Sequence, residues 1–238
     1  MNREGIYVGR KRKNLSYILA IVWVSSMALA GFFMPTFIDS LQYFKVKGIE
    51  VKGSVSIPNY IFAYAVGEFK NNWLFINEKK LLSVLNTLTD NSVEDVRIEK
   101  VFGKDGVILV MHVEERKPFL TVFSSKSSIF FDERGIPFGS KFHEPKPPYV
   151  YTNDVSLIEK GFGKLKLIVN ILKDVNRFYL TDTNTVVYTK GGRKVLLPFL
   201  AQLNDETLEM LKKIYNMNIE AREIDLTSDK MAVVRDEE

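Results

Sequence analysis

This 238-residue chain contains two histidines and no cysteine, so it has two imidazole groups and no thiol. His112 lies in an alternating segment that predicts a strand, and His143 lies beside Glu144 in a proline-rich stretch. A structural zinc site needs four such ligands and a catalytic zinc site three, so the sequence predicts neither. Thiol catalysis and disulfides are excluded as well.

Two pairs of adjacent carboxylates, Glu114 with Glu115 and Asp132 with Glu133, are the next groups that could carry chemistry. Acid–base catalysis by paired carboxyl groups needs both in one cleft, whereas neighbours on a strand point to opposite faces. We therefore expect solvated, structural roles for all four side chains.

Motifs of other enzyme classes are missing from the sequence. It contains no GxSxG segment, and residues 161–164 (GFGK) are too short for a phosphate loop and follow no predicted strand. The sequence therefore predicts a protein that is not an enzyme and that takes no cofactor, metal or small-molecule substrate.

An uncharged stretch at residues 17–38 determines how the remaining elements are positioned. A helix of that length measures about 33 Å, enough to cross a bilayer. Four basic residues at 10–13 predict a cytoplasmic tail at 1–16, with everything after the helix extracytoplasmic. The alternative is a cleaved signal peptide, because residues 28–30 (ALA) resemble a cleavage site. The apolar run continues past them to residue 38, which favours a retained anchor in the cytoplasmic (inner) membrane.

The charge of the chain follows this topology. Residues 1–16 hold five basic residues and one acidic residue, a net charge of +4, which leaves 28 basic and 28 acidic residues in the remainder. The external part is therefore neutral. This distribution is not typical of a nucleic-acid-binding protein.

Strand and helix patterns follow the anchor in residues 43–116. An alternating strand at 44–53 leads into a helix whose apolar face is formed by Ile57, Ile61, Tyr64 and Ala65. A second amphipathic helix is predicted at 77–88. Two strands, 93–102 and 107–114, enclose the turn sequence GKDG and predict a hairpin. Alternation in the second strand predicts that four residues share its apolar face: Val107, Leu109, Met111 and Val113.

The order strand, helix, helix, strand, strand resembles a POTRA domain, a module of two helices on a three-stranded sheet. The segments YFKVKGIEVKGS (43–54), NNWLFIN (71–77), VEDVRIEKVF (93–102) and VEERKPFL (113–120) resemble the bacterial cell-division family FtsQ/DivIB. The resemblance implies an anchor helix, a POTRA domain at 43–116 and a β-rich second domain at 117–235.

The second domain is expected to be α+β with a mostly antiparallel sheet. Helices are indicated by Leu165, Ile168, Leu172 and Val175, and by Leu208, Leu211 and Tyr215 after the N-cap Asn204. Strands are predicted at 119–123, 127–131, 136–138, 177–180, 185–189, 194–197, 223–226 and 230–234. Thr227 stands where the family usually has an arginine, so a role of that arginine does not transfer.

The expected function is that of a non-enzymatic, membrane-anchored scaffold at the division septum. An exposed sheet edge can bind a strand of another protein through main-chain hydrogen bonds. The resemblance implies that the last strand pairs with a small coiled-coil partner like FtsB, which itself joins one like FtsL. The residues expected there are Ile224, Leu226, Met231, Ala232, Val233 and Val234.

Two other functions stay open at this point. A POTRA-bearing component of envelope assembly or export would continue into a long β-barrel, for which about 120 residues with two amphipathic helices are too few. An anchored envelope enzyme would need a paired-carboxylate cleft or a metal.

Overall fold

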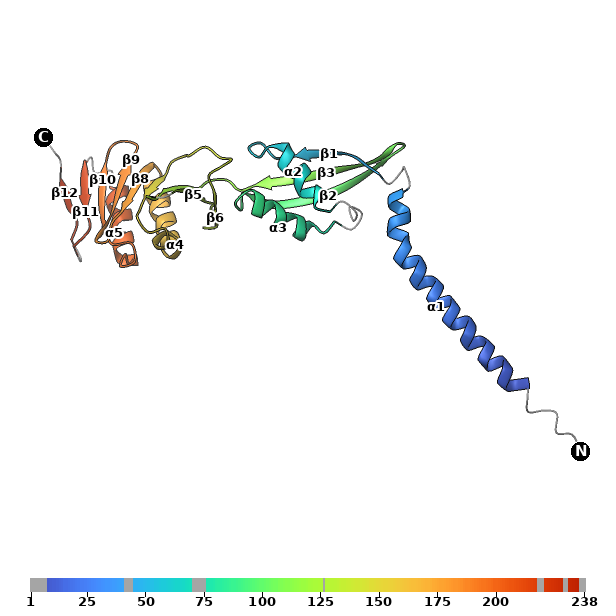
Figure 1. Cartoon of the computed structure of the whole chain (residues 1–238). Helices are drawn as coiled ribbons and strands as arrows, with labels where there is room; N and C mark the ends of the chain where they lie inside the picture. The colour runs from blue at the N-terminus through green and yellow to red at the C-terminus, as the bar shows by residue number, and fades with distance from the viewer. Residues whose placement is uncertain are drawn as a thin grey trace, which may run out of the picture.

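The computed structural model contains an N-terminal helix and two α+β units in sequence (Figure 1). The described residues are 8–40, 45–69, 76–125, 127–217, 221–228 and 231–235. The predicted segments at 43–54 and 71–77 and the strand at 230–234 lie partly outside these ranges, as does residue 126.

Helix α1 (Val8–Ser40) contains the expected apolar stretch. Its segment Ser16–Met34 is long and apolar enough to span a membrane, and none of that segment is buried against the rest of the chain. The predicted helix is confirmed, and it continues without a break through Gly31 and Pro35.

The first unit has a three-stranded sheet with two helices on one face. Its elements are β1 (Val46–Lys52), α2 (Asn59–Gly67), α3 (Glu78–Leu88), β2 (Val93–Gly103) and β3 (Gly106–Glu115). The strand order is β1-β3-β2, with β1 parallel and β2 antiparallel to β3. The predicted hairpin and the predicted order of elements are both present.

The core of the first unit lies between this sheet and its helices. The side-chain oxygen of Asn77 caps α3 by accepting a hydrogen bond from the backbone N–H of Lys79. In α2 the buried stripe runs through Ile61, Phe62, Ala65 and Val66, so the expected inward position of Tyr64 is wrong. The strand residues predicted to face inward, Val107, Leu109, Met111 and Val113, are all buried.

The second unit is built on a nine-stranded sheet, with α4 (Ser156–Leu172) and α5 (Asp205–Asn216). The strand order is β12-β11-β10-β9-β8-β7-β4-β5-β6. The strands are β4 (Leu120–Phe123), β5 (Ser128–Phe131), β6 (Pro137–Gly139), β7 (Tyr149–Tyr151), β8 (Val175–Leu180), β9 (Asn184–Thr189), β10 (Lys194–Pro198), β11 (Glu223–Asp225) and β12 (Val233–Arg235).

Most neighbouring strands of this sheet are antiparallel, as expected, but β7 pairs in parallel with both β4 and β8, and β10 pairs in parallel with β11. Strand β7 is not predicted from the sequence, because three residues after a proline-rich segment carry no periodicity. Val175 belongs to β8 and not to the helix that its spacing suggests, since α4 ends at Leu172 and Lys173 is left-handed, with φ of 54°.

Candidate partner-binding edge and the joint that orients it

Strand β12 forms one edge of the nine-stranded sheet. It pairs antiparallel with β11, which pairs in parallel with β10. No further described strand lies beyond β12, and residues 231–235 are all exposed. The C-terminal edge therefore leaves one row of backbone groups facing away from the sheet.

The six residues predicted at this edge fall into two groups. Met231, Ala232, Val233 and Val234 are exposed. Ile224 and Leu226 are only 1% and 2% exposed and belong to the core of the second unit. Their side chains therefore lie in this core and not on the exposed edge, and they hold β11 in the sheet.

The direction of the backbone groups on β12 follows from β11. Leu226 N–H donates to Leu196 C=O, and Arg222 C=O accepts from Lys194 N–H. Arg222 and Leu226, which flank β11, therefore direct their backbone groups toward β10. Successive residues of a strand alternate in this direction. Glu223 and Asp225 therefore face β12, where they pair with Arg235 and Val233.

Val234, which lies between Val233 and Arg235, consequently directs its N–H and C=O outward. An incoming strand would bond to these two groups first. This outward-facing amide is the feature that sequence reasoning did not identify, because it depends on the register between β11 and β12.

Charged side chains fix the register of this edge. Glu223 accepts from Lys194 at 2.9 Å and from Arg235 at 3.1 Å, which connects β10, β11 and β12. Asp225 accepts from the hydroxyl and the N–H of Thr227, and the hydroxyl bond is the largest cause that lowers the pKa of Asp225. Thr227 thus closes the turn after β11.

The opposite edge of the sheet, β6, is covered by the first unit. Gly139 N–H donates to Asp90 C=O at 2.7 Å, and Asn91 Nδ2 donates to Pro137 C=O at 2.9 Å. Asp90 and Asn91 have positive φ, a conformation that short polar side chains tolerate. A Cβ atom at position 139 would collide with Asp90, so glycine permits this close approach. Of the two edges, only β12 is left open among the described residues.

A buried ion pair reinforces the joint between the units. Arg116 Nη1 donates to Asp132 Oδ2 at 2.9 Å, and both side chains are buried. Arg116 also donates from Nε to Asn91 C=O and from its backbone N–H to Ser92 C=O. Asp132 Oδ1 accepts from the backbone N–H groups of Arg134 and Ile136. The expected solvated role of Asp132 is therefore wrong, although its role is structural.

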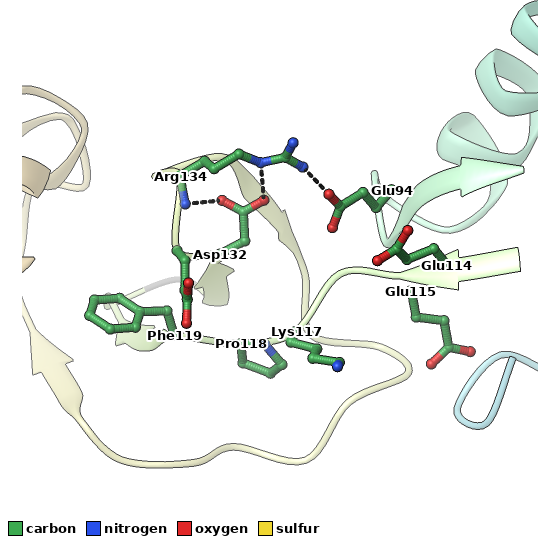
Figure 2. A pocket seen from close by; sticks show the side chains of 9 residues that line it. Glu94, Glu114, Glu115, Lys117, Pro118, Phe119, Asp132 and Arg134 are labelled. Atoms are coloured by element: carbon green, nitrogen blue, oxygen red, sulfur yellow. Dashed lines mark hydrogen bonds and ion pairs between the residues drawn. The ribbon is translucent and has the colours of Figure 1, made fainter. Parts of the chain in front are cut away.

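A polar cleft of about 410 Å³ opens at this joint (Figure 2). Arg134 bridges its rim by bonding to Glu94 at 2.6 Å and lying 3.8 Å from Asp132. Figure 2 shows Glu115 turned toward the loop after β1, away from Asp132. Glu115 and Asp132 thus do not converge as an acid–base pair, and the described residues include no group of three or more side chains that could hold a metal ion.

Glu115 binds the loop that precedes α2. Its Oε1 accepts from Ser54 Oγ and from the backbone N–H groups of Val55, Ser56 and Ile57 at 3.0 Å each. Burial acts to raise the pKa of Glu115, but these hydrogen bonds outweigh it and hold the pKa below its usual value. The carboxylate thus holds the loop before α2, whose N-cap Pro58 makes no side-chain hydrogen bond. Like Asp132, it is not simply solvated.

The two histidines have different surroundings. His112 is exposed, with Nε2 3.3 Å from Glu99. His143 packs edge-on against Phe138 and Phe130, with ring centroids 5.4 and 6.2 Å away, and its Nε2 is buried without a partner among the described residues. Burial lowers the pKa of His143, Glu115 opposes this effect, and Lys146 adds to it.

Comparison with known proteins adds one long match. No protein-family model matches the chain. An uncharacterized protein of Aquifex aeolicus is 26% identical over 187 residues, which cover 78% of this chain and 82% of that protein. A dynein heavy chain-like protein of Plasmodium falciparum is 29% identical over 72 residues, 29% of this chain but 1% of that protein. The chain is therefore similar to the Aquifex protein along most of both lengths.

Proposed function

We propose that this protein is a single-pass, non-enzymatic scaffold of the bacterial division machinery that binds a partner strand along β12. The observation that carries the proposal is the difference between the two edges of the large sheet. The first unit covers β6, whereas β12 directs the backbone of Val234 outward. Natural proteins usually block such an edge unless another strand uses it.

Strand addition at β12 explains which groups would do what. The N–H and C=O of Val234 would provide main-chain hydrogen bonds, which give affinity for an extended segment. The exposed side chains of Met231, Ala232 and Val233 would contact alternate residues of that segment and provide specificity. Ile224 and Leu226 keep β11 fixed from the core.

The anchor and the joint give this edge a defined location. Helix α1 and β12 lie at opposite ends of the chain in Figure 1. With the basic residues at 10–13 on the cytoplasmic side, the two α+β units are extracytoplasmic. Confinement to the membrane raises the effective concentration of the edge for other anchored proteins.

The division setting rests on the resemblance to FtsQ/DivIB and is supported by the β-α-α-β-β order of the first unit, as in a POTRA domain. The partners are then small anchored coiled-coil proteins like FtsB and FtsL, and the site of action is the septum. The expected alternatives, an export component and an envelope enzyme, gain no support from Glu115 and Asp132, whose carboxylates bind structural partners.

The binding test uses Val234, because a substitution there can remove the outward backbone N–H alone. Val234→Pro removes the outward N–H but leaves the groups that face β11, a position at which edge strands tolerate proline. Val234→Thr keeps the N–H and the β-branched shape. Full-length protein in detergent should capture the FtsB-like partner as wild type and as Val234→Thr, and at least tenfold less as Val234→Pro.

Unchanged thermal unfolding of Val234→Pro would show that its sheet is intact. Equal capture by all three proteins would exclude strand addition at β12. Loss of capture by Val234→Thr as well would mean that the side chain, and not the backbone, is recognised.

A further inference from the structure

The turn of the β2–β3 hairpin lies at the same end of the first unit as the start of β1. Val107 pairs with Phe102 and with Val46, and Val107 N–H donates to Lys45 C=O at 2.9 Å. We define residues 45–47 and 100–108 as the hairpin end. Figure 1 shows this end directed toward the C-terminal end of α1.

Apolar side chains are exposed on both faces of the hairpin end. Phe102 is 56% exposed, and it pairs with Val107, whose side chain faces the core. Val101 and Ile108 pair on the opposite face and are 42% and 44% exposed. The hairpin end therefore projects as an apolar wedge past the two helices, which cover one face of the rest of the sheet (Figure 1).

Basic residues surround this wedge. The hairpin end contains four lysines and a single acidic residue, Asp105, a net charge of +3. The lysines are Lys45, Lys47, Lys100 and Lys104. Glutamates begin only in the next row of the sheet, where Glu99 and Glu50 pair with Val110. The positive charge is thus concentrated at one end.

The connection to α1 is short enough to keep this end at a membrane. Helix α1 continues six residues past Met34, the end of its apolar segment, which adds about 9 Å. Six chain steps from Ser40 to Val46 span at most about 21 Å. The hairpin end can therefore reach the headgroup region that covers the hydrocarbon core.

We infer that the hairpin end inserts Phe102, Val101 and Ile108 into the outer surface of the membrane that α1 crosses, with the lysines on anionic phospholipid headgroups. Each lysine near an anionic surface favours the bound state by roughly fivefold. This second contact would orient the two units relative to the membrane. It rests on the membrane-anchoring part of the proposed function and does not depend on the β12 partner.

The test uses the full-length chain, whose lack of cysteine permits single labelling sites. Val101→Cys places an environment-sensitive NBD dye at the hairpin end. Val55→Cys is the matched control, because Val55 is also exposed but follows β1 at its other end. Both proteins are reconstituted into vesicles of phosphatidylcholine with phosphatidylglycerol that contain lipids spin-labelled near the headgroup.

Insertion predicts at least twofold stronger quenching of the Val101→Cys label than of the Val55→Cys label, reduced in pure phosphatidylcholine. Adding Phe102→Ser and Lys104→Gln to the Val101→Cys protein should reduce the quenching further. Unchanged quenching would mean that the label is only held near the membrane by the anchor, and it would overturn the inference. Equal quenching of the two labels would also overturn it. Flotation with the vesicles is scored separately, and its failure would contradict the membrane anchor itself.

Discussion

Arg116 donates to Asp132 over 2.9 Å at the boundary between the two units, and both side chains are buried. Removing one partner of a buried ion pair leaves the other charge without compensation, at a cost of about 3 kcal/mol. We therefore expect Arg116→Met to lower the free energy of unfolding by about that amount. Denaturant unfolding of the full-length chain in detergent, followed by circular dichroism, measures the change.

The control is a double-mutant cycle with Asp132→Asn, which keeps the Oδ1 acceptor for Arg134 and Ile136 but removes the charge. In that background Arg116→Met should cost clearly less, because no carboxylate remains buried without its partner. Strictly additive costs would mean that the ion pair does not stabilise the joint.

Gly139 permits the close contact between β6 and the turn before β2. Gly139→Ala would force its Cβ against Asp90 and should lower the unfolding free energy by about 1–3 kcal/mol, as overpacking does. Gly163→Ala is the matched control, since no atom lies within 4 Å of a Cβ there and the residue is inside α4. It should stabilise the protein by up to about 1 kcal/mol. Equal effects in thermal unfolding would exclude the steric account.

Glu115 should make stability depend on acid pH. Because hydrogen bonds lower its folded-state pKa below 4.5 despite burial, its contribution is complete above pH 4.5 and is lost as pH falls through the folded-state pKa. Glu115→Gln should cost about 1 kcal/mol at pH 7, and the difference from wild type should shrink below pH 4.5. Urea unfolding at several pH values measures it. The neighbouring, exposed Glu114→Gln should have little effect at any pH.

His143 should add a second, less acidic dependence. Burial lowers its folded-state pKa below 6.5, so the unfolded chain binds the proton more readily and stability falls as pH drops below 6.5. The slope is at most about 1.4 kcal/mol per pH unit. His143→Leu should remove this slope in melting experiments from pH 7 to 5.5, whereas His112→Gln should retain it. A slope that persists in His143→Leu would assign the titration to another group.

The sequence alone predicted the helix start and the hairpin, because both depend on residues that are close together in the chain. Asn204 is a recognisable N-cap, and its side chain accepts the backbone N–H of Thr207 in α5. The alternation through β2 and β3 gave the hairpin and its inward residues, because burial of one face enforces a period of two. These features involve residues close together in the chain.

Features that depend on distant partners were not predictable. Glu115 bonds to residues about sixty positions earlier, and Asp132 bonds to Arg116 across the joint. Because these partners are distant in the sequence, the adjacent carboxylates were wrongly expected to be solvated. Ile224 and Leu226 alternate like exposed-edge residues but are covered from the core side. Lys173 ends α4 in a left-handed conformation, where a glycine would have been recognisable.

The most direct test of the proposed scaffold is imaging of an N-terminal fluorescent fusion in dividing bacterial cells. We predict a band at the division site for wild type and for Val234→Thr, and a uniform membrane signal for Val234→Pro at equal abundance. This result would connect the outward amide of β12 to recruitment or retention at the septum. A uniform signal for the wild-type fusion throughout division would contradict the division role, and an unchanged band for Val234→Pro would contradict recruitment through β12.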